Sequence, residues 1–264
     1  MIRLLEEKDR GWLMAYLVRE PAINLFMIGD VELFGFDKDF QRIWADFDDE
    51  GAIKAVLLRY RDNFIPYSEL AAYDWTALAA VIDGWFGEKR VSGKLTTIDA
   101  IAQLLKGYTR KDYYFCELRG GLKGRYVDNI EVKLGCADDA ARFHEFIEGI
   151  DEFSGFGNRV ERYSEKINSG SGRIYYMEND QGELMTMTQT TAENSVSAMV
   201  VGVATAKAYR GQGLMSACLT KLCEDALEEG KSLCLFYNNP AAGKVYLKMG
   251  FKEIDHWSML TFKV

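Results

Sequence analysis

Apolar and polar residues follow the same order twice along this chain. Each series opens with a segment that is typical of a short strand, at 1–5 and again at 129–134, followed by an acidic helix start and two helix-like stretches. Each then reaches two β-prone runs joined by an acidic turn that ends in glycine, at 42–59 and at 173–190. Two such runs around a short turn are typical of a hairpin. The pattern predicts strands mixed with helices in both halves.

Matching residues in the two hairpins indicate an internal duplication. A repeat must be recognised first, because missing it leads to a wrong fold assignment. The residues that recur 131 positions apart are Arg42 and Arg173, Ile43 and Ile174, and Gly51 and Gly182. Later, Gly107-Tyr108 and Gly250-Phe251 stand 143 positions apart, so the second copy is longer after its hairpin. Chance resemblance between two hairpins is the alternative. We predict two related α/β domains, 1–118 and 127–264, joined by a glycine-rich linker at 119–126.

The additional residues of the second copy surround a strand, a glycine turn and a long helix. Val200–Ala206 is apolar and β-prone, and the helix has an apolar face and a stop signal at Gly230. Glycine turns at helix starts bind anions through backbone N–H groups. The N–H groups that can face an anion here are those of Gly211, Gln212, Gly213 and Leu214. Arg210 can add a charged contact or brace the turn, and an ordinary tight turn is the alternative.

A second strand and helix follow. Ser232–Tyr237 is an apolar run, Asn239 and Pro240 suit a helix start, and Gly250 suits its end. With these residues the sequence resembles the GCN5-related N-acetyltransferase (GNAT) superfamily. The pyrophosphate motif Arg-x-x-Gly-x-Gly/Ala is met by Arg210 and Gly213, with Met215 in place of the last small residue. The later motif Asn-x-x-Ala-x-x-x-Tyr, running on to Gly-Phe, is met by Asn239, Ala242, Tyr246, Gly250 and Phe251.

The resemblance covers 195–264 and extends less specifically over 127–264. It implies that each domain has a mixed, mostly antiparallel sheet flanked by helices. It also implies that Val203, Ala204 and Thr205, at the end of one strand, part from the next strand and pair with the pantetheine arm of acetyl-CoA. The N–H groups of 211–214 would hold the pyrophosphate, with the bulk of Met215 beside them.

The same resemblance implies a role for two residues of the last helix. Asn239 would contact the pantetheine or cap its own helix, and Tyr246 would face the coenzyme sulfur. A neutral amine would then attack the thioester, and backbone N–H groups of the parted strand would form an oxyanion hole. Tyr246, with an ordinary pKa of about 10 against about 8.5 for a thiol, would protonate or hydrogen-bond the sulfur. A packing role for Tyr246 is the alternative.

Neither the general base nor the acceptor site is fixed by the sequence. His256 is one candidate for the base and a water chain is another, while Glu193 lies outside the strand. For the acceptor, Asp151 and Glu152 can bind a cationic amine. Phe153 or Phe156 can form an apolar wall beside them. A solvated acidic loop with anchoring aromatic residues is the alternative. We expect a primary amine of a small molecule as the acceptor.

The first copy lacks the coenzyme motif. Where its phosphate turn should fall, Pro66–Thr76 contains neither Gly-x-Gly nor arginine. We therefore predict that the N-terminal copy is degenerate and binds no acetyl-CoA.

Composition and charge disfavour several classes of protein, among them those that bind nucleic acid, span a membrane or hold a metal ion. A net charge of −8 without a cationic run disfavours nucleic acid. The longest apolar stretch, Ala198–Ala206, is too short to cross a bilayer. A charged segment at 1–10, five scattered cysteines and two histidines favour a cytoplasmic protein without a metal site. We expect a monomer or homodimer that binds neither nucleic acid nor membrane.

The predicted activity is acyl-CoA-dependent N-acyl transfer, most simply acetyl transfer from acetyl-CoA. Transfer of another acyl or aminoacyl group is one alternative. A non-catalytic acyl-CoA-binding regulator is the other, since Met215 departs from the motif and no base is identified.

Overall fold

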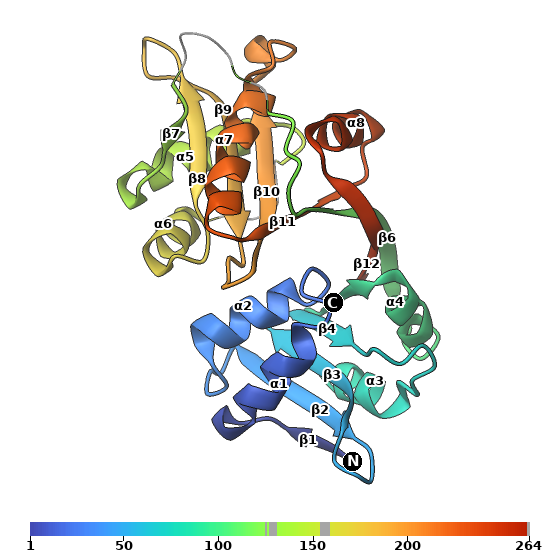
Figure 1. Ribbon diagram of the computed structural model, residues 1–264. Helices are drawn as coiled ribbons and strands as arrows, with labels where there is room; N and C mark the ends of the chain where they lie inside the picture. The colour runs from blue at the N-terminus through green and yellow to red at the C-terminus, as the bar shows by residue number, and fades with distance from the viewer. Residues whose placement is uncertain (125, 127–130, 154–158, 263–264) are drawn as a thin grey trace. The chain divides into compact units, whose positions relative to one another are not determined.

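The computed structural model describes residues 1–124, 126, 131–153 and 159–262, which form two compact units (Figure 1). Unit 1 comprises Met1–Phe115 and the chain from Ile254 onward, and unit 2 comprises Cys116–Glu253.

Unit 1 is a mixed sheet with helices packed on it. Its elements are β1 (Ile2–Leu4), η1 (Glu7–Asp9), α1 (Arg10–Leu17), α2 (Leu25–Phe34), β2 (Gln41–Phe47), β3 (Ile53–Tyr60), β4 (Asn63–Tyr67), α3 (Thr76–Asp83), β5 (Arg90–Lys94), α4 (Leu95–Ala102), β6 (Tyr108–Leu118) and β12 (Lys252–Phe262). The strand order is β1-β2-β3-β4-β5-β12-β6. The β4–β5 pair is parallel, whereas β1–β2, β2–β3, β3–β4 and β5–β12 are antiparallel.

Unit 2 repeats this plan. Its elements are β7 (Lys133–Leu134), η2 (Ala137–Asp139), α5 (Ala140–Glu148), α6 (Val160–Ser169), β8 (Ile174–Glu178), β9 (Leu184–Thr191), β10 (Ser197–Thr205), η3 (Lys207–Tyr209), α7 (Leu214–Glu228), β11 (Ser232–Tyr237) and α8 (Pro240–Met249). The strands follow the order β11-β10-β9-β8-β7. The β10–β11 pair is parallel and the others are antiparallel. This mixed, mostly antiparallel arrangement confirms the predicted fold class.

Two apolar cores cover the opposite faces of the unit 2 sheet. Tyr175 and Met177 on β8 pack with α7 and α8, whereas Ile174 and Tyr176 on the same strand pack with α5 and α6. Successive residues of a strand point to opposite faces, so this alternation places the helices in two layers. Figure 1 shows α7 crossing one face of β8, β9 and β10.

The two hairpins agree in detail, which supports the duplication. In the first, Asp48 donates its backbone N–H to Ala52 and accepts from Gly51 (3.0 and 3.3 Å). In the second, Asn179 makes the equivalent bonds with Glu183 and Gly182 (3.0 and 2.9 Å). Each partner stands 131 positions after its counterpart. Both hairpins also have a register shift at their ends, between Asp46 and Phe47 and between Met177 and Glu178. The same turn is therefore built twice.

The contact-based units and the predicted repeat ranges divide the chain differently. By contacts, most of β12 belongs to unit 1, whereas the repeat range 127–264 places it in the second copy. The repeat ranges remain a proposal. Residue 125 of the predicted linker and residues 127–130 at the start of the predicted second domain lie outside the described residues. The described part of the linker is anchored, because the Lys123 N–H donates to the Met249 carbonyl (2.9 Å).

An ion-pair network joins the sheet of unit 2 to the end of α7. Arg173 binds both oxygens of Glu193 (2.9 and 2.7 Å) and of Glu229 (2.5 and 2.7 Å), and Lys231 contacts the same two carboxylates. Burial raises the pKa of Glu193, but hydrogen bonds from Arg173 and Thr190 outweigh burial and leave that pKa low. The hydrogen bond from Arg173 lowers the pKa of Glu229 to about 2.

We predict that Arg173→Met lowers the free energy of unfolding of unit 2 by about 3 kcal/mol, because it leaves buried Glu193 with less compensation. Both carboxylates have depressed pKa values, so their contribution is present above their ordinary pKa and lost as the pH falls toward about 2. The variant should therefore lose stability less steeply in acid. Urea unfolding across this pH range measures both effects. Lys221→Met, which breaks an exposed pair with Asp225, is the control; an equal loss there would contradict the prediction.

Candidate functional site

Strands β10 and β11 stop pairing before either strand ends. Their parallel ladder runs from Ser197–Ser232 to Val200–Leu235. Beyond it, β10 continues to Thr205 and β11 to Tyr237. On its other edge β10 stays attached to β9, where the Thr186 hydroxyl donates to the Ala204 carbonyl (2.8 Å). The backbone of 201–205 thus has one edge free of the β11 ladder. This segment contains the predicted residues Val203, Ala204 and Thr205.

A β-bulge lies where the strands part. Against β9, Val201 pairs with Gln189 and Ala204 with Met187, so β10 has one additional residue there. Such a residue has no ladder partner, and the strand bends around it. Gly202 adopts φ of +55°, and a Cβ built on it would lie 2.1 Å from the Gln189 amide nitrogen. The positive φ and the closeness of the Gln189 side chain therefore both favour glycine at this bulge.

The predicted anion turn follows directly. Gly211 and Gly213 have φ values of +79° and +83°, which glycine adopts without strain, and Gly213 is the N-cap of α7. The first bond within the helix runs from the Ala217 N–H to the Gly213 carbonyl (3.1 Å). The N–H groups of 214–216 therefore have no partner within the helix. Leu214 and Met215 turn their side chains toward the apolar core, whereas Gln212 is exposed.

Arg210 braces this turn, one of the two roles that the sequence left open. Its Nε donates to the Thr205 carbonyl (3.1 Å), which ties the turn to the end of β10. Its guanidinium also pairs with the Glu152 carboxylate (3.0 Å). The hydrogen bond from Arg210 lowers the pKa of Glu152. The structure thus joins a predicted coenzyme residue to a predicted acceptor residue.

Tyr246 lies in the apolar core beside the end of β11. Its ring contacts Tyr237 and Phe251, with centroids 6.2 and 6.1 Å away. Burial, with a smaller contribution from Cys116, raises the pKa of Tyr246 to about 12. The ring is therefore a packing residue, and the phenol keeps its proton throughout the neutral range. Among the described residues its hydroxyl has no hydrogen-bond partner.

Asn239 caps α8. Its side-chain oxygen accepts from the Ala241 N–H (2.9 Å), and Pro240 occupies the first helical turn. Asn239 thus caps its own helix, which is one of the two roles considered for it, and the residue is exposed.

The remaining predicted residues are not all gathered at the site. Asp151 and Glu152 lie in an exposed turn, and Phe153 packs against the core under α5 and α6. Phe156 lies outside the described residues. Of the base candidates, Glu193 is held in the ion-pair network. His256 belongs to unit 1, where its ring contacts Tyr114 (4.9 Å between centroids).

The corresponding helix start in unit 1 is already occupied by an acid. α3 begins after Trp75 without a glycine turn, and the Asp74 carboxylate accepts from the Thr76 N–H (3.0 Å) and hydroxyl (2.6 Å). These hydrogen bonds lower the pKa of Asp74, so it is an anion at neutral pH. A fixed carboxylate repels a phosphate from this helix start.

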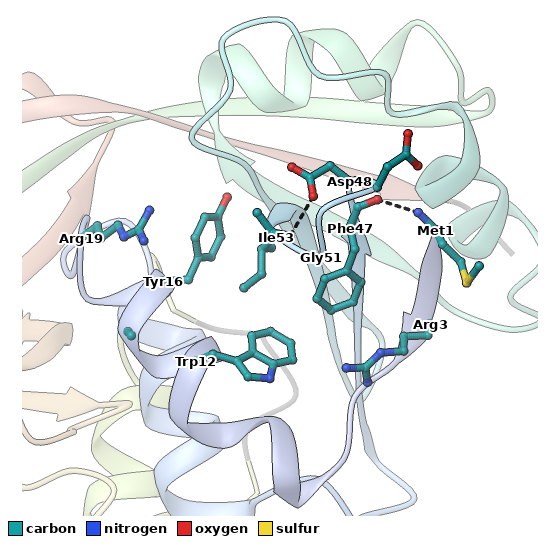
Figure 2. A pocket seen from close by; sticks show the side chains of 12 residues that line it. Met1, Arg3, Trp12, Tyr16, Arg19, Phe47, Asp48, Gly51 and Ile53 are labelled. Carbon is teal, nitrogen blue, oxygen red and sulfur yellow. Dashed lines mark hydrogen bonds between the residues drawn. The ribbon is translucent and has the colours of Figure 1, made fainter.

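Unit 1 also contains a hollow of about 760 Å³ between α1 and the β2–β3 turn. Figure 2 shows the apolar side chains that line it, Trp12, Tyr16, Phe47 and Ile53. Its cations are already paired, Arg3 with Asp9 (2.7 and 2.9 Å) and Arg19 with Glu69 (2.9 Å). None of the predicted site residues lines it, so we assign no acyl transfer to this hollow.

The described residues show neither a metal cluster nor a membrane-spanning helix. In the ranges that the structure describes, no cluster of three or more His, Cys, Asp or Glu residues is arranged to hold a metal ion. No helix within those ranges is both long and apolar enough to cross a membrane.

Comparison with known proteins defines the class. Residues 143–251, all within unit 2, match the model of the Acetyltransferase (GNAT) family. A search of curated proteins gives no match. Solved structures match nearly the whole chain. A Drosophila structural-genomics protein has a TM-score of 0.75 at 10% identity, covering 99% of this chain and 98% of its own.

Two further structures extend this likeness. A GCN5-related N-acetyltransferase from Sphaerobacter thermophilus has a TM-score of 0.64 at 15% identity, covering 99% of this chain and 94% of its own. A tandem GNAT protein from the clavulanic acid biosynthesis pathway has a TM-score of 0.61 at 12% identity, covering 99% and 97%. At these identities the likeness shows the fold. Residues 143–251 of unit 2 thus match the GNAT family model, and the fold of nearly the whole chain is like that of a tandem GNAT protein.

Sequence reasoning missed the residues around the bulge. Gly202 stands alone in an apolar run, and an isolated glycine in a strand is a signal of a bulge. Gln189 and Lys166, which meet beside Gly202, lie in segments that carry no family motif. Their proximity follows only from strand register and helix packing.

We predict that Gly202→Ala lowers the free energy of unfolding by about 2 kcal/mol, because alanine is strained at this φ and its Cβ would displace the Gln189 amide. Gly211→Ala has the same φ strain in open space and should cost about 1 kcal/mol. Urea unfolding of both variants gives the comparison. Equal losses would show that Gln189 does not occupy the space over Gly202.

Proposed function

We propose that unit 2 transfers an acetyl group from acetyl-CoA to a primary amine of a small molecule. The observation that carries this proposal is the parting of β10 from β11 at a bulge, directly before a glycine turn at a helix start. An extended thioester with a diphosphate at one end needs these two features side by side. The five free cysteines suit a reducing compartment such as the cytoplasm.

The donor would lie along the free edge of β10. Backbone groups of Val203, Ala204 and Thr205 would pair with the amides of the pantetheine arm, as one strand pairs with another. The diphosphate would take the N–H groups of 211–216, which have few partners and stand at the positive end of the α7 dipole. Asn239 would offer its side-chain nitrogen from the opposite side of the opening.

Arg210 supplies a charge to this end of the site. In the structure it is paired with Glu152, so a bound phosphate would compete with that carboxylate for the guanidinium. Glu152, once displaced, would bind a cationic acceptor together with Asp151, and Phe153 would remain an anchor of the turn.

The reaction would begin with attack of a neutral amine on the thioester carbonyl. Negative charge develops on the carbonyl oxygen, and backbone N–H groups of the parted strand would stabilise it. The C–S bond then breaks and the thiolate leaves. Because burial raises the pKa of Tyr246 to about 12, its hydroxyl would donate a hydrogen bond to the thiolate and keep its proton.

Acetyl-CoA binding by calorimetry tests the donor site. We expect one site per chain, and we expect Arg210→Ala combined with Gly213→Trp to abolish binding by removing the cation and blocking the helix start. Glu152→Gln is the matched control, because it frees Arg210 from its carboxylate and should bind acetyl-CoA at least as tightly as the native protein. A second site, or unchanged binding in the double variant, would contradict the assignment to α7. No binding to the native protein would refute the function.

Tyr246→Phe tests the role of the phenol. A hydrogen bond to a charged group contributes about 1.5–3 kcal/mol, so turnover should fall about 10- to 100-fold. Affinity for acetyl-CoA should change little, since the ring remains packed. Because the phenol stays protonated up to about pH 12, the variant should keep the pH dependence of the native protein at neutral pH. Unchanged turnover would show that Tyr246 only packs.

A further inference from the structure

A lysine lies beside the bulge, on the face of the sheet that α6 covers. Met187 on β9 packs in the same core as Tyr163 of α6, and Gln189, two residues further along β9, points to the same face. There the Lys166 Nζ donates to the Gln189 side-chain oxygen at 2.5 Å. The other end of that amide, its nitrogen, lies over Gly202. One amide group therefore separates the lysine nitrogen from the bulge.

Two glycines make room for this pair. A Cβ on Gly202 would meet the Gln189 nitrogen at 2.1 Å, and a Cβ on Gly172 would meet the Lys166 Cδ at 2.9 Å and the Thr190 carbonyl at 2.2 Å. Larger residues at either position would displace the lysine or the glutamine. The lysine stem is thus held by the backbone around it, with its nitrogen directed to β9.

Burial lowers the pKa of the Lys166 ammonium to about 8. Among the described residues, Tyr163 on α6 has its ring centre 5.9 Å from Nζ, and His144 and Glu148 on α5 neighbour Tyr163. The other charged residues of these two helices are Arg142, Glu145, Glu161, Arg162 and Glu165. On the sheet side, Arg173 and Glu193 are paired with each other. A substantial fraction of the lysine is therefore a neutral amine at slightly alkaline pH, with a lone pair able to take a proton.

We propose that Lys166 is the general base of the transfer, with Gln189 as the residue that positions its nitrogen beside the bulge. This inference rests on the proposed function. The acceptor nitrogen forms a bond to the thioester carbon, and the π electrons move to the oxygen. Neutral Lys166 then takes the proton that the acceptor nitrogen must lose. The electrons on the oxygen then re-form the C=O bond, the C–S bond breaks and its electrons leave with sulfur. The proton on Lys166 passes to the solvent or the thiolate.

The test uses acetyl-CoA alone, with water as the acceptor, and follows release of free CoA by chromatography from about pH 6 to about pH 10. A base acts in its deprotonated form, so the native rate should rise through about pH 8 and be lost as the pH falls below it. Lys166→Met should lower the rate at the plateau by about 10²- to 10⁴-fold and remove this rise. Lys166→Arg should lose as much, because an arginine stays protonated.

Three comparisons separate this role from others. If Lys166 acted through its positive charge, Lys166→Arg would retain the rate, and the native rate would fall above about pH 8; either result would overturn the proposal. Gln189→Met should keep the rise but move it to lower pH, since the ammonium loses its acceptor. Glu148→Gln should keep the native rise, and a rise lost in that variant alone would assign the base to Glu148. Lys221→Met serves as the exposed-lysine control.

Two readouts keep failure of this inference distinct from failure of the proposed function. Calorimetry should show acetyl-CoA binding to native protein and to all Lys166 variants alike. Acetylation of lysines by acetic anhydride, mapped by mass spectrometry, should give a midpoint near pH 8 for Lys166, without any turnover. No binding or no CoA release by the native protein would refute the proposed function, and this inference with it. Binding and release with an unchanged pH profile in Lys166→Met would refute the base alone.

Discussion

The end of β10–β11 pairing at Val200 and Leu235 is the constraint on which the site depends. Strands that have begun a ladder ordinarily continue it, because unpaired backbone groups are costly when water is excluded. Here the additional residue at the bulge bends β10, while Thr186 keeps its other edge attached to β9. The backbone donors and acceptors released in this way would pair with the extended ligand that we propose. The glycine turn and the α8 cap directly follow the two strands that part.

The two copies show how one scaffold supports different chemistry. Their hairpins have the same turn bonds and the same register shifts. They diverge at the helix that follows the fourth strand. In unit 2 a glycine at positive φ leaves that helix start open, and in unit 1 Asp74 fills it with a negative charge. A carboxylate at this point would repel a phosphate, although the surrounding fold is retained.

Much of this architecture follows from the sequence because its signals are local. The glycine turn at 211–213, the Asn239-Pro240 helix start and the repeated hairpins each lie within a few adjacent residues, and their geometry is set by backbone conformation. The prediction that β10 and β11 part rested on the family resemblance, because no local sequence pattern indicates where a parallel ladder ends. The sequence did not decide whether Arg210 contacts a ligand or braces the turn. Its pairing with Glu152 depends on how a loop distant in the sequence packs. The pairing of Lys166 with Gln189 could not be predicted, because 23 positions and the whole of β8 separate the two residues. Likewise, the rise in the pKa of Tyr246 comes from burial among side chains far apart in the chain.

The path of the last strand has a consequence for how the protein forms during synthesis. β12 follows all of unit 2 in the chain, yet it pairs with β5 of unit 1 from Trp257–Lys94 to Thr261–Arg90. While the chain emerges from the ribosome, the edge of β5 that pairs with β12 stays without that partner. More than half of the chain must be synthesised after β5 before β12 is available. Unit 2 holds nearly all of its own residues in one continuous segment and can complete its cores earlier. Unit 1 is therefore synthesised first but completed last. In the nascent chain, the exposed edge of β5 is the place where pairing with a wrong strand is most readily made.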